Sequence, residues 1–330
     1  MAPRENPALF GHEAAEREFD AARAGGRLHH AWLITGPEGV GKATLTFRFA
    51  RRLLATRGDA NDPANPVFRR VAQKTHADLL TVEREFDDKK KRQRTEIVVD
   101  DARDIAGFLR LTPAEGGWRV VVVDGAEHLN RNAANALLKV LEEPPQRAVL
   151  LLSCAAPGRL LATIRSRCRL LPLRPLGDAD MSRALALVLP EEGEGARAGL
   201  AAISGGSPGR AALLAAEGGI AIAALVDEVL LAAPAIPVAR AYEVADRLAR
   251  SEAGYTNFMD LLRDRLGVAL RRAARGGSAH EGADRLAGLR PLGEWSEVWH
   301  ALGRLQDETE RANLDKRHAI VAGLDLLNAR

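Results

Sequence analysis

The sequence predicts an α/β domain with a parallel sheet, followed by an all-helical second half. In the first half, short apolar runs alternate with amphipathic stretches, the pattern of parallel strands joined by helices. From about Leu176 onward the strand pattern fades, and alanine, leucine and arginine recur at helical spacing. A chain of 330 residues is long enough for two or three domains, each with its own core.

Three runs in the first half are predicted as central strands. Each is continuously apolar and is bounded by polar or turn residues, as expected for strands covered on both faces. They are Trp32 to Thr35, Val120 to Val123 and Ala148 to Leu152.

A helix is predicted over residues 130–143. Leucines 137, 138 and 141 follow Ala134 at helical spacing, which gives one apolar face, and Pro144 with Pro145 ends the helix. In the helical half, a turn is predicted at Ser204 to Gly209, and Gly218-Gly219 is a plausible boundary between a small helical unit and a larger one.

Composition excludes several classes of protein. The hydrophobic fraction of 46% argues against disorder, and 2 cysteines cannot build a disulfide framework, which favours a reducing compartment. No signal-peptide pattern and no apolar run of about 18 residues is present, so we expect a cytoplasmic protein. A formal charge of +3, from 47 basic and 44 acidic residues, is too balanced to establish nucleic-acid binding.

One conspicuous charge run extends from Asp87 to Arg94. A solvated hairpin or loop is the favoured interpretation. The alternative is a DNA-facing loop that uses Lys89 to Arg94, which would make the chain a stand-alone DNA-binding adaptor.

A glycine-rich segment, GPEGVGK from Gly36 to Lys42, follows a predicted strand and precedes a helix predicted to start near Ala43. This context is typical of a P-loop, in which backbone N–H groups converge on a phosphate and the lysine reaches the β- and γ-phosphate oxygens. The alternative is a strand-to-helix turn with no ligand. The candidate nucleotide-binding residues are Gly36, Gly39, Gly41, Lys42, Thr44 and Asp124.

Two positions depart from a hydrolytic site. Ala43 stands where the motif places a Ser or Thr hydroxyl on Mg²⁺, and Thr44 is turned away by about 100°. Asp124 follows a strand as a Walker B-type aspartate, but the next residue is Gly125. Glu127 is interpreted as a surface carboxylate near a helix start. Phosphate binding could therefore persist while metal-assisted hydrolysis is impaired.

Further motifs resemble a known family. The segment NALLKVLEEPP, from Asn135 to Pro145, is similar to the NALLKxLEEPP segment of bacterial clamp-loader subunits, and Ser166-Arg167-Cys168 matches their SRC motif. The motifs extend the resemblance over nearly the whole chain. It implies an AAA+ fold of three parts: a nucleotide-binding-like domain at 1–171, a small helical lid at 172–217 and a helical collar at 218–330.

Within this family, the resemblance implies a member that does not hydrolyse ATP. The ATP-hydrolysing gamma/tau subunits keep GKT or GKS and an Asp-Glu pair, whereas this chain has GKA and Asp124-Gly125. Their sensor-2 arginine would align with Gly209, and Arg210 is displaced by one position. No cofactor is then required, and residual ATP or ADP binding stays open. The rival hypothesis is an active gamma/tau-like ATPase.

The resemblance also implies partners and site residues. The partners would be gamma/tau and delta subunits, with the sliding clamp and primed DNA reached through the complex. Arg167 would be an arginine finger for the ATP of a neighbouring subunit, a contribution worth about 10³–10⁵ in rate in related hydrolases. The alternative is that Arg167 pairs with a local carboxylate. Ser166 would orient the turn, and Cys168 would be a small buried residue rather than a nucleophile.

One departure concerns metal. Family members usually carry a four-cysteine zinc module before Walker B, but the corresponding stretch, about Ala55 to His76, contains no cysteine. Because a structural zinc needs a full set of N or S ligands, we predict no metal.

Overall fold

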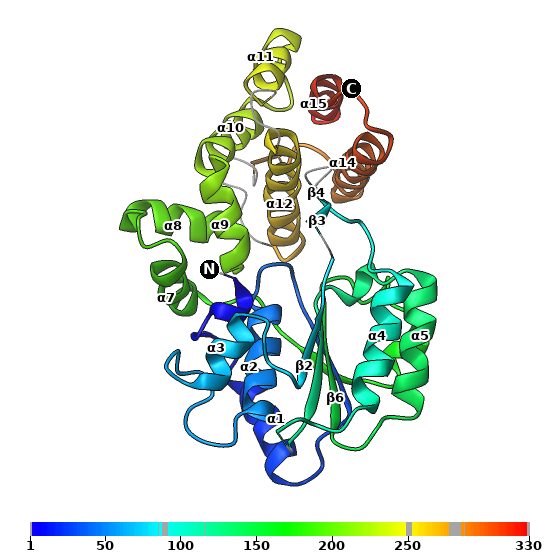
Figure 1. Cartoon of the computed structure of the whole chain (residues 1–330). Helices are drawn as coiled ribbons and strands as arrows, with labels where there is room; N and C mark the ends of the chain where they lie inside the picture. The colour runs from blue at the N-terminus through cyan, green and yellow to red at the C-terminus, as the bar shows by residue number, and fades with distance from the viewer. Residues whose placement is uncertain are drawn as a thin grey trace. The chain divides into compact units, whose positions relative to one another are not determined.

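Helices cover both faces of a parallel sheet in the first half of the chain (Figure 1). The computed structural model describes residues 2–84, 86–87, 92–115, 117–248, 253–276, 285–286 and 288–328. The predicted fold class, an α/β part with a parallel sheet followed by a helical part, is confirmed.

The chain divides into two compact units. The first consists of Met1–Glu192 together with Gly205–Arg210, and the second of Gly193–Ser204 together with Ala211–Arg330. Residues 172–217 are shared between these units, and the three-part boundaries at 171 and 217 remain predictions.

The sheet of the first unit has five parallel strands in the order β2-β5-β6-β1-β7. The three predicted central strands are confirmed as β1, β5 and β6, and two strands that were not predicted lie at the edges. The bounds are β1 (Ala31–Thr35), β2 (Leu79–Val82), β5 (Arg119–Val123), β6 (Ala148–Cys154) and β7 (Arg169–Pro172).

Alternate residues of the central strands pack on opposite faces of the sheet, which gives three layers. Trp32 joins the cluster that contains Phe19 and Phe49, whereas Leu33 joins the cluster on the other face. In Figure 1, α1, α2 and α3 lie on one side of the sheet, and α4 and α5 lie on the other. These helices are α1 (Glu13–Ala24), α2 (Lys42–Leu54), α3 (Pro66–Ala72), α4 (Val99–Arg110) and α5 (Arg131–Glu142).

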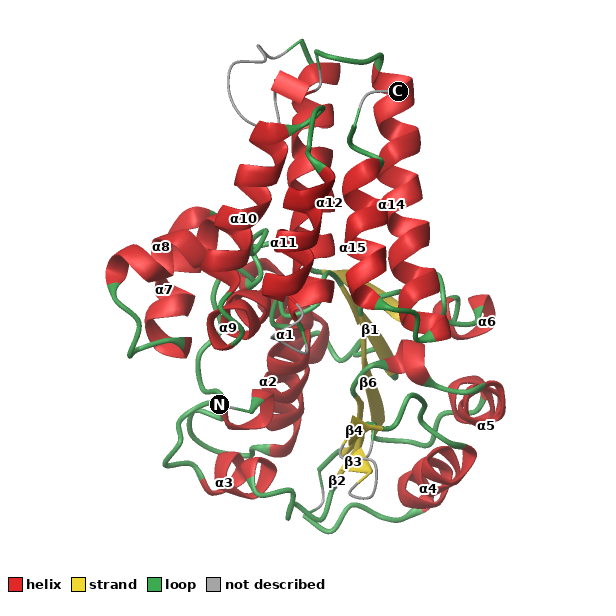
Figure 2. Cartoon of the chain, turned by 90° about the horizontal axis from the view of Figure 1, so that it is seen from above, coloured by secondary structure: helices red, strands yellow, loops and turns green. Residues whose placement is uncertain are grey.

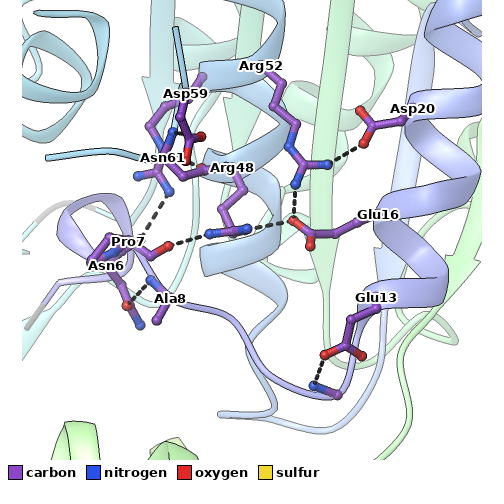
Figure 3. A network of polar contacts seen from close by, with 12 residues as sticks. Asn6, Pro7, Ala8, Glu13, Glu16, Asp20, Arg48, Arg52, Asp59 and Asn61 are labelled. Atoms are coloured by element: carbon purple, nitrogen blue, oxygen red, sulfur yellow. Dashed lines mark hydrogen bonds and ion pairs between the residues drawn. The ribbon is translucent and has the colours of Figure 1, made fainter. Parts of the chain in front are cut away.

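Ion pairs join α1 to α2, the helix that follows the glycine-rich loop. Glu16 of α1 lies 2.8 Å from Arg48 Nε and 2.6 Å from Arg52 Nη2, and Arg52 Nη1 lies 2.7 Å from Asp20 (Figure 3). The side chains of Glu16 and Arg48 are only 16% and 11% exposed, so solvent screens this contact less than an ordinary surface pair. The start of the chain is fixed as well, because Arg48 donates to the Pro7 carbonyl.

Arg51 of α2 contacts both the start of the chain and the stretch from Ala55 to His76. Buried Arg51 donates to the carbonyls of Arg4 and Asn6, both at 3.0 Å, and to Asn61 Oδ1 at 3.2 Å. Burial lowers the Arg51 pKa to about 10, so the guanidinium stays charged at neutral pH. In the described part of the chain, no cluster of three or more His, Cys, Asp or Glu side chains is placed to hold a metal ion.

A short antiparallel hairpin interrupts the first unit between β2 and α4. Strand β3 (Phe86–Asp87) pairs with β4 (Arg92–Gln93), which confirms the hairpin expected for this charge run. Lys89, Lys90 and Lys91 lie outside the described residues. The DNA-facing alternative for Lys89 to Arg94 therefore remains a prediction.

Beyond the sheet, the described chain is helical, as predicted. In the second unit α12 packs against α10 and α14, and α15 packs against α11 and α14; Figure 2 shows the long helices α12 and α14 as helical rods. None of the described helices is both long and apolar enough to cross a membrane. The helices are α7 (Asp178–Val188) in the first unit, then α8 (Glu194–Ile203), α9 (Pro208–Ala216), which spans the unit boundary, α10 (Gly219–Ala232), α11 (Val238–Leu248), α12 (Gly254–Ala274), α14 (Leu292–Ala312) and α15 (Lys316–Asp325).

Candidate functional site

The glycine-rich loop connects the carboxyl end of β1 to α2, as predicted for a P-loop. Gly36, Gly39 and Gly41 have φ values of +150°, +70° and +110°, a region that side chains disfavour. The N–H groups of Gly39, Val40 and Gly41 donate no hydrogen bond to any residue that the structure describes. Such N–H groups at a helix start are a suitable arrangement for an anion.

Lys42 is the first residue of α2 and is only 8% exposed. Its Nζ donates to the Pro37 carbonyl at 2.7 Å, within the loop itself. Burial lowers the Lys42 pKa, while the nearby charges of Glu127, Glu38 and Asp124 oppose this change. The Lys42 ammonium therefore lies near acidic side chains of its own chain, which favour its charged form.

Asp124 directly follows β5, where it meets Ser153 of the adjacent strand β6. Ser153 Oγ donates to Asp124 Oδ1 at 2.5 Å and accepts from the Gly125 N–H at 3.0 Å. Burial raises the pKa of Asp124, although the bond from Ser153 works against that change. The predicted Walker B-type aspartate is thus half-buried, at the same carboxyl edge of the sheet as the loop.

The interpretation of Glu127 as a surface carboxylate is wrong. Glu127 lies in the short 3-10 helix η2 (Ala126–His128), where its Oε1 accepts from the Ala155 N–H at 2.9 Å and its Oε2 is buried. This oxygen has no hydrogen-bond partner among the described residues. A turn after β5 aims the side chain inward, and the sequence carries no periodic pattern that reveals such a direction.

The two departures from a hydrolytic motif have distinct structural settings. Ala43 lies in the first turn of α2, where its methyl group offers no metal ligand, and the adjacent Thr44 is buried. Gly125 has φ +80°, and a Cβ added there would lie 2.9 Å from His128 Cδ2. The backbone after Asp124 therefore disfavours any side chain.

The predicted turn at 204–209 contacts the loop directly. Ser207 Oγ donates to the Glu38 carbonyl at 2.7 Å, and the Gly209 N–H donates to the Gly39 carbonyl at 2.9 Å. A Cβ on Gly209 would lie 2.6 Å from Gly39 Cα. The close backbone contact thus requires glycine at both positions. Because Gly39 and Gly209 lie far apart in the sequence, no local sequence pattern indicates this contact.

The Ser166-Arg167-Cys168 motif follows helix α6 (Ala162–Arg165) and precedes β7. Ser166 is the C-cap of α6, and its Oγ donates to the Thr163 carbonyl at 3.1 Å; its turn-orienting role stays a prediction. Cys168 packs against the apolar cluster on one sheet face, and burial raises its thiol pKa to about 12, so it is not a ready nucleophile.

Arg167 contacts a carboxylate of its own chain. Its Nη2 lies 3.0 Å from Glu142 Oε1, and its Nη1 donates to the Thr163 carbonyl at 3.0 Å. The Arg167 side chain is 37% exposed. The local pairing considered as the alternative is therefore present, and the finger assignment stays a prediction.

A parallel sheet with a glycine-rich loop after its central strand β1 and an aspartate after β5 defines an α/β protein of the P-loop type. The chain matches the family described as "DNA polymerase III, delta subunit" over residues 11–177. The chain therefore belongs to the DNA polymerase III delta subunit family.

Two relatives illustrate the range of similarity. DNA polymerase III subunit delta' of Pseudomonas aeruginosa is 41% identical over 201 residues, which are 60% of this chain and 60% of that protein. DNA polymerase III subunit tau of Escherichia coli is 34% identical over 169 residues, which are 51% of this chain and 25% of that protein. The matched region thus spans less than two thirds of either relative.

A solved structure also resembles the chain. It is a DNA polymerase III gamma subunit-related protein of Thermotoga maritima, with a TM-score of 0.43 and 18% identity, covering 96% of this chain and 98% of that chain.

Proposed function

We propose that the chain is a delta-prime type subunit of a DNA polymerase III clamp loader, which helps to load a sliding clamp onto primed DNA without hydrolysing ATP itself. Family membership and the 41% identity to a delta' subunit support this proposal. Its partners are then the gamma/tau and delta subunits, and its DNA contacts are made within the complex.

Gly125 is the observation that carries the non-hydrolysing assignment. AAA+ ATPases use a glutamate at this position to polarise the attacking water, and removal of a general base costs about 10²–10⁴ in rate. Here the backbone has φ +80°, and a Cβ would meet His128 at 2.9 Å. Ala43 also replaces a group that hydrolysis needs, the hydroxyl that binds magnesium, because a methyl group cannot bind the metal.

Arg167 is proposed as the residue that acts on a neighbour's ATP. Its guanidinium is partly exposed beside the C-terminal end of α5, and a planar guanidinium suits the charge that develops on a transferred phosphoryl group. A subunit that does not hydrolyse ATP can in this way still control hydrolysis next to it.

No cofactor is required in this proposal, and residual binding of ATP or ADP is compatible with it. The loop keeps Gly36, Gly39, Gly41 and Lys42, with backbone N–H groups that have no acceptor among the described residues. The Lys42 ammonium, however, is already bound to the Pro37 carbonyl. Nucleotide binding can be measured directly by titration of the purified chain.

Reconstitution tests the proposal. Mixed with gamma/tau and delta subunits, the chain should form a stable complex that loads a clamp. Arg167→Ala should leave assembly intact but slow hydrolysis at the neighbouring site by about 10³-fold or more, so that the DNA-stimulated ATPase of the complex falls. Arg165→Ala is the matched control, because Arg165 points to the Pro157 carbonyl instead. An unchanged rate for Arg167→Ala would remove the finger assignment.

The rival hypothesis, an active ATPase, predicts a different result for the isolated chain. Steady-state ATP turnover by the purified protein that disappears in Lys42→Ala would overturn the non-hydrolysing assignment. We expect no turnover above background in either form.

A further inference from the structure

Glu142 occupies a position that local helix energetics do not explain. It is the last residue of α5, and the carbonyl dipoles at a helix C-terminus disfavour a negative side chain. A second carboxylate, Glu143, follows directly, and Pro144 then ends the helix. A positive partner for Glu142 offsets its unfavourable place, and that partner is Arg167.

The contact is specific among the arginines of this segment. Arg165 Nη1 donates to the Pro157 carbonyl at 3.0 Å. Arg169 binds Glu18 at 2.8 Å and lies over the ring of Trp32. Only Arg167 of these three contacts the end of α5 in the described structure.

The geometry of the Arg167 guanidinium is fixed from two sides. Glu142 Oε1 contacts Nη2 and the Thr163 carbonyl contacts Nη1, both at 3.0 Å. A guanidinium carries more N–H donors than these contacts use, so an anion can be bound while both remain. An unrestrained arginine would lose considerable side-chain freedom on binding a phosphate, and a preoriented one loses less.

We propose that Glu142 is the positioning residue of the arginine finger, holding the Arg167 guanidinium ready for the phosphate of a neighbouring nucleotide. This inference rests on the proposed function of Arg167. Because the pair is exposed, it contributes little to stability, and its effect falls on hydrolysis rather than on folding.

The experiment uses the clamp loader reconstituted from the full chain with gamma/tau and delta subunits, clamp and primed DNA. Glu142→Ala should lower kcat at the neighbouring site by about 3- to 10-fold, which is measured as a fall in the DNA-stimulated ATPase, with little change in KM for ATP, since the finger acts on the transition state. Glu142→Asp should recover part of the rate. Glu143→Ala is the matched control, a glutamate with no ion pair in the described chain, and should behave as the native complex does.

A double variant separates positioning from a general structural effect. Arg167→Ala/Glu142→Ala should be no slower than Arg167→Ala, because Glu142 acts only through the guanidinium. Should Glu142→Ala assemble poorly, the isosteric Glu142→Gln provides the same comparison.

The outcomes distinguish this inference from the proposed function. If Arg167→Ala slows hydrolysis while Glu142→Ala and Glu142→Gln match Glu143→Ala, the positioning role is wrong and the finger stands. A faster Glu142→Ala complex would also overturn the inference, since Glu142 would then restrain the finger. If Arg167→Ala has no effect on hydrolysis, the finger assignment is wrong, and the positioning role of Glu142, which rests on it, is wrong as well.

Discussion

The buried Lys42 ammonium beside the glycine-rich loop has acidic side chains near it. Lys42 faces the charges of Glu127, Glu38 and Asp124, and burial favours the neutral form of both the lysine and Asp124. Glu127 is anchored by the Ala155 N–H at the end of β6. The acidic neighbours of Lys42 can thus stabilise its charge without a phosphate.

The contact between Gly209 and Gly39 gives a prediction for stability. In Gly209→Ala the new Cβ would lie 2.6 Å from Gly39 Cα, so one of the two backbones must shift. We expect the free energy of unfolding to fall by about 1–3 kcal/mol, the usual cost of overpacking. Gly195→Ala, where a Cβ meets nothing within 4 Å, is the control. Equal urea midpoints for the two variants would contradict this account.

His76 gives a prediction for pH dependence. The residue is only 4% exposed, and its Nδ1 accepts from the Asp78 N–H at 3.2 Å. Burial, aided by the charge of Arg70, lowers the His76 pKa. As pH falls below about 6.5, the unfolded chain binds a proton before the folded chain does, so the free energy of unfolding falls with acidification.

In His76→Asn, an amide oxygen can replace the Nδ1 acceptor but does not titrate. The decline in the free energy of unfolding between pH 7 and pH 5 should therefore be smaller in this variant. His30 and His128 also have lowered pKa values, so part of the decline should remain. Denaturant unfolding at a series of pH values measures the difference; identical slopes would show that His76 is not responsible.

The positions of the site motifs were predictable from the sequence, whereas several side-chain partners were not. Gly36 to Lys42 and Asp124 could be located because each follows an apolar strand. Glu127 was misinterpreted, because its direction depends on the turn after β5 and on the Ala155 N–H of another strand end. An ion pair between Arg167 and a local carboxylate was one of the two alternatives. The sequence did not identify the partner, because Glu142 lies at the end of α5, which the fold brings close to Arg167.

Helix α5 ends at Glu142, and its start is defined by a cap. Asn130 Oδ1 accepts from the Ala133 N–H at 2.9 Å. Asn130→Ala should lower the free energy of unfolding by about 0.5–2 kcal/mol, since a helix N–H loses its acceptor. The control Asn132→Ala changes an exposed residue within the same helix and should have little effect. Thermal unfolding compares the two variants, and a larger loss for Asn132→Ala would exclude the cap as the cause.

Central and edge strands differed in how well the sequence predicted them. β1, β5 and β6 are buried on both faces and therefore read as continuous apolar runs. β7 lies at an edge, where Arg169 and Leu170 are exposed, and β2 at the other edge is only partly buried. β7 has only two apolar residues before Pro172, and β2, Leu-Leu-Thr-Val, is a short run that is only partly buried, so the local pattern separates these edges from loops less clearly.

The two units of the chain have separate cores, and this leads to a prediction for the whole molecule. We expect calorimetry to show more than one unfolding transition, because each unit buries its own apolar residues. Gly209→Ala should lower only the transition of the first unit. Leu266→Ala, a fully buried residue of α12, should lower only that of the second, by about 2–5 kcal/mol. A single transition lowered by both variants would show that the units unfold together.

The backbone at Gly125 also limits what a designed substitution at this position can achieve. A glutamate placed there would take a left-handed conformation that L-residues disfavour, with its Cβ 2.9 Å from His128. A carboxylate at position 125 would therefore need a second, compensating change, such as a smaller residue at 128.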